Sequence, residues 1–341
     1  MEKELLLPED AIYLLLKETS PTDRPVLEQI LLKHLPTDEQ SDYNSIIKGE
    51  KNPSLMSDVI AKKIFDADEH PERLEYLFRE TVGDNKIVID HSFKNEGYIQ
   101  STNSKKTIFD IDAVTKDNRI ADMEFQVSAQ DTYLRRGELY GSDLLMLQYS
   151  IENNQKKSDV NYENVNGVIL VFLLKHSTKE LKEYNKNSKR YIHRFKEHKA
   201  ESGLSYTPLI QTIYVQLDEC YKQFIRGEDG ENNPNLQLLL SMLYDSNNPK
   251  VLEKVNCNSM YMSIIIESQK LVQDKEVQAM LLAEKYAVAD LNAIKKHERI
   301  EGEVEGKAQN ALRVYNNCIA RGMSKEDAIA ISEIDVTRIP L

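Results

Sequence analysis

The 341-residue sequence predicts an α/β (α+β) protein, with a mixed central sheet flanked by helices, preceded by N-terminal helices and followed by a mostly helical C-terminal region. Three observations support this prediction. Apolar residues recur at helical spacing from residue 53 to residue 81 and again in the C-terminal third, whereas they alternate with polar residues between residues 86 and 128. The run Val168 to Leu174 is continuously apolar, which is typical of a strand buried on both faces.

Residues 1–50 are predicted to form a helical extension, with helices at Pro8–Lys17 and Asp23–Leu35 and a polar linker at Pro36–Lys51. A helical hairpin follows between Pro53 and Thr81, since His70 and Pro71 are typical of a helix beginning. We identify no chemistry in residues 1–50.

The central domain is predicted to span residues 53–220. After the helical hairpin, its sequence patterns indicate a further helix, Gln130–Tyr149, a polar loop at Asn153–Asn164, and six strands, at Lys86–Ile89, Thr107–Val114, Ile120–Val127, Gly167–Leu174, Arg190–Phe195 and Leu209–Leu217.

Residues 221–341 are predicted to be helical. The expected helices are Asn235–Tyr244, Pro249–Val255 and a long one from Tyr261 to His297. Near the end, Gly322 is a helix stop and Ser324 with Asp327 resembles a capping box. These C-terminal helices are also candidates for self-association into a homo-oligomer.

The composition excludes several classes of protein. A hydrophobic content of 40% with 29% charged residues is that of a soluble globular protein. No apolar run reaches the roughly 18 to 20 residues that a membrane helix needs, and the acidic N-terminus does not resemble a signal peptide. The three cysteines lie far apart, so neither a disulfide framework nor a zinc site is indicated. We therefore expect a cytoplasmic protein that contacts no membrane.

The net charge of −12 argues against a protein that coats nucleic acid through bulk electrostatics. A local basic track is still present, because the segment from Lys175 to Lys199 holds nine Lys and Arg residues against three Glu. This segment is either a solvated surface strip or a track for DNA phosphates.

Acidic side chains gather on two neighbouring predicted strands. Side chains alternate between the faces of a strand, so Asp110 and Asp112 share one face, and Asp122, Glu124 and Gln126 share a face of the next strand. If these faces coincide, several carboxylates converge, which is an arrangement that suits Mg²⁺. Asp112 and Asp122 are either further acids of such a site or exposed, and we favour exposed.

The turn between the two strands decides whether the acids meet. A two-residue loop at Asp117–Asn118 would place Asp110 opposite Phe125, and the acids would then lie on opposite faces. A three-residue turn or a bulge brings Asp110 and Glu124 together, and Asn118 tolerates the left-handed conformation that such a turn requires. The alternative is a hairpin with an acidic, solvated outer face.

The hairpin and the segments around it resemble the recombination-promoting nuclease / putative transposase family of the PD-(D/E)xK nuclease superfamily. The most specific residues are Lys105–Ala113, Asp117–Arg119 and Met123–Ser128, followed by Gln130–Asp131, Arg135–Arg136 and Tyr140. Supporting similarity extends upstream, at Ser57–Phe65, and downstream, at Glu301–Lys307 and Ala320–Ser324. The resemblance covers about residue 55 to the C-terminus and leaves residues 1–50 unaccounted for.

The resemblance implies a restriction-endonuclease-like core in a bacterial, Mg²⁺-dependent (or Mn²⁺-dependent) DNA endonuclease with a role in transposition or recombination. Asp110 and Glu124 would hold the metal, and Gln126 stands where the superfamily usually has Lys. Arg136 and Tyr140, four apart on one helix face, suit a contact with the DNA backbone beside the metal. From the basic segment we assign Lys189, Arg190 and Arg194 to DNA.

Two other functions remain open. Gln126 supplies no positive charge, and together with the acidic net charge it favours a catalytically degenerate DNA-binding or assembly protein of mobile-element origin. The third hypothesis is an interaction protein whose hairpin face is only solvated.

Overall fold

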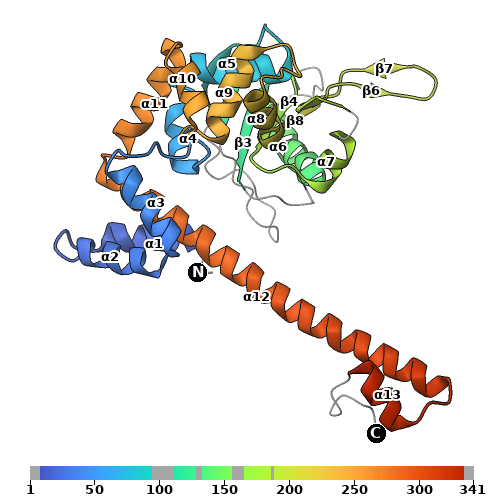
Figure 1. The fold of residues 1–341 in the computed structure, drawn as a ribbon. Helices are drawn as coiled ribbons and strands as arrows, with labels where there is room; N and C mark the ends of the chain where they lie inside the picture. The colour runs from blue at the N-terminus through green and yellow to red at the C-terminus, as the bar shows by residue number, and fades with distance from the viewer. Residues whose placement is uncertain (1–7, 94–110, 128–132, 156–164, 186–187, 334–341) are drawn as a thin grey trace. The chain divides into compact units, whose positions relative to one another are not determined.

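The computed structural model describes residues 8–93, 111–127, 133–155, 165–185 and 188–333 (Figure 1). The chain divides into two compact units. The helical unit comprises Met1–Gln40 and Leu282–Leu341, and the sheet unit comprises Ser41–Leu281. The domain limits predicted at residues 50–53 and 220–221 both fall inside the sheet unit.

A six-stranded mixed sheet forms the centre of the sheet unit, as the alternation pattern predicts. The strand order is β1-β2-β3-β4-β8-β5, in which β3-β4 and β4-β8 are parallel and the other pairs are antiparallel. The strands are β1 (Ile89–Ser92), β2 (Ile111–Thr115), β3 (Ile120–Gln126), β4 (Val168–Leu174), β5 (Ile192–Phe195) and β8 (Ile210–Gln216). The first strand begins three residues later than predicted.

A three-residue turn joins β2 and β3. Ile111 pairs with Met123 and Val114 with Ile120, and the Thr115 N–H donates to the Arg119 carbonyl at 3.0 Å. Asn118 takes the left-handed conformation, with φ of 60°. The hairpin therefore has the register that the prediction required for its acids to share a face.

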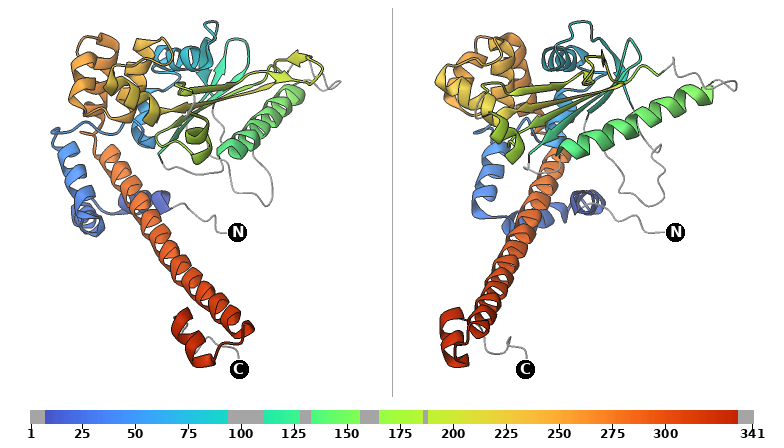
Figure 2. Two further views of the ribbon diagram at one scale, coloured as in Figure 1. Left: turned by 45° about the vertical axis from the view of Figure 1, so that its right-hand side comes forward. Right: turned by 90° about the vertical axis from the view of Figure 1, so that its right-hand side faces the viewer.

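Helices cover both faces of the sheet (Figure 2). On one face α6 (Tyr133–Gln155) and α7 (Lys179–Asn185) bury the even-numbered residues of β4, among them Leu170 and Phe172. The opposite face is contacted by α5 (Pro71–Val82) and α8 (Leu217–Arg226). Every residue of β4 is at most 1% exposed, which confirms the strand predicted to be buried on both faces.

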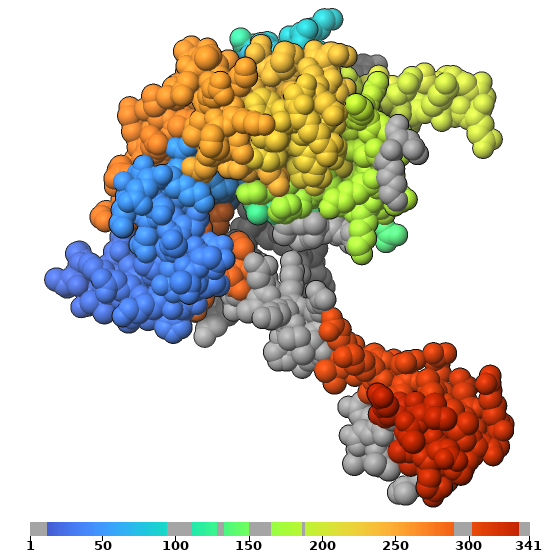
Figure 3. Space-filling view, viewed as in Figure 1, coloured from blue at the N-terminus to red at the C-terminus, as the bar shows by residue number. Residues whose placement is uncertain are grey.

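The remaining helices of the sheet unit are α4 (Asp58–Ile64), α9 (Pro234–Tyr244), α10 (Pro249–Val255) and α11 (Ser259–Leu271). In Figure 3, α8 to α11, yellow to orange, form one continuous surface of this unit. A short ribbon of β6 (His198–Lys199) and β7 (Ser205–Tyr206), which was not predicted, stands out from it (Figure 1).

The helical unit holds α1 (Pro8–Glu18), α2 (Arg24–His34) and α13 (Lys325–Ser332), and its limits fall within α3 (Thr37–Ile47) and α12 (Lys275–Ala320). The helices predicted at residues 8–17 and 23–35 are confirmed. The Ser324 hydroxyl accepts from the Asp327 N–H at 3.1 Å, as the predicted cap requires. No helix in the described part of the chain is long and apolar enough to cross a membrane.

Two predicted elements are wrong. The expected linker at residues 36–51 contains α3, whose buried Tyr43 and Ile46 form a short apolar stripe within a polar segment. The single helix expected from Tyr261 to His297 is two helices, because the Asp274 carboxylate accepts from the N–H of Glu276 at 2.7 Å and caps the beginning of α12.

Candidate active site

Glu124 lies in the middle of the sheet, on the face covered by α6. It is paired with Phe172 of β4 and is 0% exposed. Gln126, two residues along β3 and half-buried, donates from its Nε2 to the Glu124 Oε2 at 2.8 Å. The strand alternation thus presents a carboxylate and an amide side by side.

Arg136 of α6 contacts both of these side chains. Its Nη2 lies 3.3 Å from the Glu124 Oε2, and its Nη1 lies 3.4 Å from the Gln126 Oε1. Because Glu124 is buried and the Arg136 side chain is 27% exposed, this ion pair is shielded from solvent on the acid's side. The structure therefore brings together Glu124, Gln126 and Arg136.

Tyr140 lies one helical turn after Arg136 and supports it. The Arg136 guanidinium carbon is 4.5 Å from the centre of the Tyr140 ring, a cation–π distance. The Tyr140 ring in turn contacts Phe172, with ring centres 6.5 Å apart. The aromatic residues connect the arginine to the core of the sheet.

The close approach of α6 to the sheet depends on two glycines. A methyl group at Gly141 would lie 2.4 Å from Ile210, and one at Gly137 would meet the hydroxyl of Tyr214. That hydroxyl donates to the carbonyl of Tyr133 at 3.2 Å. Sequence reasoning missed this feature, although two glycines four apart inside a helical pattern are a signal of close packing.

The acids around Glu124 are more buried than predicted. Asp122 is 0% exposed, and Asp112, with which it is in register, is half-buried. The expectation that both are exposed is therefore wrong. Asp122 lies beside Leu170 of β4, a strand that is next to the hairpin only in the folded chain.

Carboxylate oxygens are the ligands that a hard cation such as Mg²⁺ prefers. Directly opposite residues of a sheet have Cβ atoms about 4.5–5.5 Å apart, so Asp112 and Asp122 are close, and Glu124 follows on the same face. Buried carboxylates repel one another unless a cation or a proton relieves them. Mg²⁺ is bound by one or two carboxylates with other oxygen ligands. Among the described residues, no group of three or more His, Cys, Asp or Glu residues is arranged so that it could hold a metal ion.

Asp110, the other predicted metal ligand, lies outside the described residues. It directly precedes Ile111, the first residue of β2, whose partner on β3 is Met123.

The basic residues expected to contact DNA differ in their surroundings. Lys189 and Arg190 are exposed just before β5, and the Lys189 ammonium forms a surface ion pair with Glu228 at 3.2 Å. Arg194 pairs with Ile213, so it lies on the face opposite Glu124. Its Nε donates to the Thr81 carbonyl at 2.6 Å, so it caps the last turn of α5. Burial, the largest cause, lowers the pKa of this guanidinium, and Glu231 opposes the shift.

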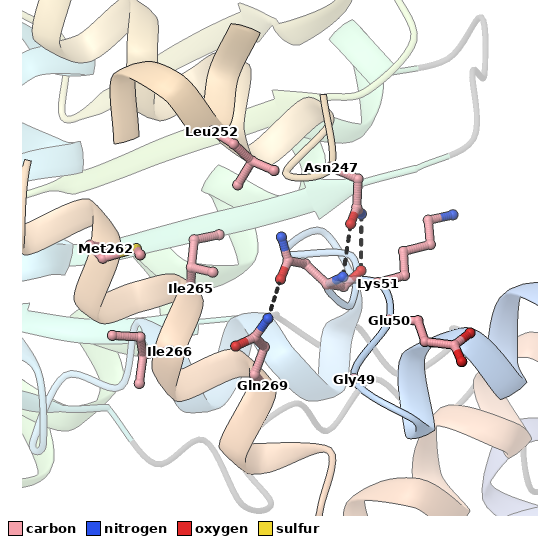
Figure 4. A pocket seen from close by; sticks show the side chains of 10 residues that line it. Gly49, Glu50, Lys51, Asn247, Leu252, Met262, Ile265, Ile266 and Gln269 are labelled. Carbon is pink, nitrogen blue, oxygen red and sulfur yellow. Dashed lines mark hydrogen bonds between the residues drawn. The ribbon is translucent and has the colours of Figure 1, made fainter. Parts of the chain in front are cut away.

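A separate cavity of about 340 Å³ lies beside α11 (Figure 4). Its polar wall is the side chain of Asn247, which bonds the N–H and carbonyl of Asn52, while Gln269 donates to the Asn52 side chain at 2.8 Å. None of the candidate site residues lines this cavity, and these amides satisfy one another.

Comparison with known proteins gives one match. A family model described as PD-(D/E)XK nuclease family transposase matches residues 55–298. The comparisons with curated proteins and with solved structures found no match. The matched residues contain the β2–β3 hairpin, α6 and the rest of the sheet, and they make up well over half of the sequence. The chain therefore belongs to the PD-(D/E)XK nuclease family of transposases.

Proposed function

We propose that the protein is a metal-dependent DNA endonuclease that hydrolyses phosphodiester bonds. The observation that carries the proposal is the contact of one carboxylate oxygen, Oε2 of buried Glu124, with both Gln126 and Arg136. An acid that can bind a metal, a hydrogen-bonding amide and a cation are groups by which phosphoryl-transfer sites position and stabilise the transition state. Family membership supports a nuclease-like role.

The sheet topology supports a restriction-endonuclease-like core as part of this proposal. The antiparallel β2–β3 hairpin is followed by α6, which crosses to the parallel strand β4. This order puts the acids of β3 and the polar residues of α6 on one face.

Each residue has a separate task in the proposed reaction. Asp110 and Glu124 would hold Mg²⁺, or Mn²⁺ in its place. When bound, this ion polarises the scissile phosphate and lowers the pKa of an attacking water. Gln126 orients the water or a phosphate oxygen through its amide. Arg136 and Tyr140 contact the DNA backbone.

Lys189 and Arg190 extend the proposed DNA contact beyond the site, because their charges face solvent. For Arg194 we propose a role in capping α5 in place of the expected DNA contact, because its guanidinium donates to the carbonyls of Thr81 and Glu80. A track of exposed cations makes binding strongly dependent on salt.

The test is nicking of supercoiled plasmid with Mg²⁺, by the wild type and by the variants Asp110→Asn and Glu124→Gln. Both variants are expected to lose at least about 100-fold in rate, as is common when a group acting in the transition state is removed. Glu138→Gln is the matched control, since Glu138 is an exposed acid of α6.

Three outcomes separate the open hypotheses. Mg²⁺-dependent nicking that Glu124→Gln abolishes and Glu138→Gln retains supports the endonuclease. DNA retardation without cleavage supports the degenerate DNA-binding or assembly protein. Absence of any DNA interaction leaves the interaction protein.

A further inference from the structure

Arg136 is the cationic group that contacts both candidate site residues of β3 in the part of the chain that the structure describes. Its two terminal nitrogens lie 3.3 Å from Glu124 and 3.4 Å from Gln126. Gln126 is neutral, and the neighbouring residues Asp122 and Glu124 are acids. The positive charge beside these side chains therefore comes from α6 rather than from β3.

The guanidinium is held in position before any substrate arrives. Its face packs on Tyr140, which rests on buried Phe172. The first turn of α6 is held by the hydroxyl of Tyr214, which donates to the carbonyls of Tyr133 and Leu134. A charge fixed in this way needs no reorganisation when the reaction occurs.

Arg136 also has hydrogen-bonding capacity to spare. Both of its contacts on β3 are longer than the roughly 2.7–2.9 Å of a strong charged hydrogen bond. Its Nε is buried and has no hydrogen-bond partner among the residues that the structure describes. Arginine has five N–H donors in a planar fork that matches phosphate. The guanidinium can thus donate to a phosphate oxygen and still remain close to Glu124.

In the proposed hydrolysis, a positive charge beside the phosphate would stabilise the transition state. The oxygen of water bonds to phosphorus while one ester P–O bond breaks. One proton of the water goes to the departing alcohol oxygen, and the other goes to the phosphomonoester or to solvent. Negative charge on the phosphoryl oxygens is stabilised by a cation in transition states of this class. The Gln126 amide carries no charge to supply this stabilisation.

We propose that Arg136 is a catalytic residue, which donates to a non-bridging phosphate oxygen and supplies the cationic stabilisation of the transition state that Gln126 lacks. This inference rests on the proposed function. It assigns Arg136 to the chemical step, whereas an arginine that only anchors DNA acts on binding.

The experiment compares Arg136→Ala with Arg135→Ala, which removes the same charge from an exposed neighbouring position. The single-turnover rate of cleavage is measured with Mg²⁺, and affinity for a labelled duplex is measured in EDTA. Arg136→Ala is expected to lower the rate at least about 100-fold and to change the affinity far less. Arg135→Ala is expected to retain the wild-type rate.

Two rescues test the position of the charge. Arg136→Ala with Gln126→Lys places a cation on β3, and free guanidinium ion replaces the lost group directly. Both rescues are expected to restore at least about a tenth of the cleavage rate that Arg136→Ala loses. If Arg136 only supported the fold, neither rescue would raise the rate. Arg136→Lys keeps the charge and is the milder variant if Arg136→Ala folds poorly.

Several results would overturn the inference alone. If the wild type cleaves and Arg136→Ala cleaves equally fast, or if affinity and rate fall together without rescue, Arg136 is not catalytic while the nuclease proposal stands. If the wild type shows no Mg²⁺-dependent cleavage, the proposed function fails, and this inference fails with it.

Discussion

A methyl group on the α-carbon of Gly137 would lie 2.3 Å from the hydroxyl oxygen of Tyr214. The same group would also meet Thr212 at 3.2 Å and Phe172 at 3.3 Å. Helix α6 therefore approaches β4 and β8 at a distance that only glycine permits at this position. Since Arg136 is the preceding residue, the glycine also determines where the guanidinium lies.

Gly137→Ala is expected to destabilise the protein. Overpacking a close contact costs about 1–3 kcal/mol, which exceeds or offsets the roughly 1 kcal/mol that alanine contributes in a helix over glycine. Urea unfolding measures the change. Adding Tyr214→Phe to this variant should recover part of the loss, because the hydroxyl is the nearest atom.

Gly302→Ala is the control for this substitution. Gly302 lies within α12, and a methyl group there meets nothing within 4 Å. The variant is expected to be as stable as the wild type or more stable. Equal behaviour of the two alanine variants would contradict the packing argument.

The left-handed conformation of Asn118 predicts a second substitution series. A β-branched residue with positive φ is strained by about 1–2 kcal/mol, so Asn118→Val should destabilise the protein by that amount. Asn118→Gly should change the free energy of unfolding by less than about 0.5 kcal/mol, because glycine adopts this conformation freely. Both variants keep the Asn118 carbonyl, which accepts from Gln148.

Lys116→Val in the same turn is the matched control. Lys116 is exposed and is not among the described residues with positive φ. If it loses as much stability as Asn118→Val, exposure of an apolar side chain is the cause rather than the backbone conformation.

Strong local patterns predicted the centre of the fold. Strands β3 and β4 lie within a residue of the expected positions, because alternation and continuous burial are direct consequences of strand geometry. The register of the hairpin was left open by the sequence, in which Asn118 permits a three-residue turn without requiring it, and the structure has this turn. Helix α3 was missed, because it buries only Tyr43 and Ile46 and therefore has a weak apolar pattern in the sequence.

The sequence could predict which side chains of the site share a face, but it could not predict how deeply they are buried. The spacing of Arg136 and Tyr140 predicted that they share one helix face. In the structure Arg136 contacts Glu124, and Tyr140 packs against the Arg136 guanidinium. The burial of Asp122 could not be predicted, because its neighbour across the sheet is Leu170 of β4, which is far away in the sequence. Similarly, the sequence does not distinguish Arg194 from the other basic residues of its segment. Its contacts with α5 form only when the folded chain brings this helix next to β5.

The three cysteines should differ in reactivity with a thiol reagent. Burial, the largest cause, raises the pKa of the Cys220 thiol well above its ordinary value, so this thiol stays protonated and unreactive as the pH rises from 7 to 9. Exposed Cys257 should react first and partly exposed Cys318 next, while Cys220 should react only after unfolding.

Counting released chromophore in native buffer and in denaturant checks this order. Cys257→Ser should remove the fastest native equivalent, and Cys220→Ser should remove the one that appears only in denaturant. Rapid native reaction of all three thiols would contradict the burial of Cys220.

Substitutions of Arg194 and Arg190 should affect different properties, namely stability in the first case and DNA binding in the second. The Arg194 guanidinium donates to the carbonyls of Thr81 at 2.6 Å and Glu80 at 3.0 Å, at the negative end of the α5 dipole. Arg194→Ala leaves these acceptors without the donor and should destabilise the protein by about 1–3 kcal/mol in urea unfolding. Arg190→Ala removes an exposed side chain and should change stability by less than about 0.5 kcal/mol.

For DNA binding, Arg190→Ala should have the larger effect of the two variants. Below its unfolding temperature Arg194→Ala should bind duplex DNA as the wild type does, whereas Arg190→Ala should bind more weakly, with the slope of log affinity against log salt reduced by about 1. Fluorescence anisotropy over a series of salt concentrations measures both quantities. A reduced slope for Arg194→Ala would show that this arginine contacts phosphate despite its bonds to α5, and an unchanged slope for Arg190→Ala would remove it from the proposed DNA track.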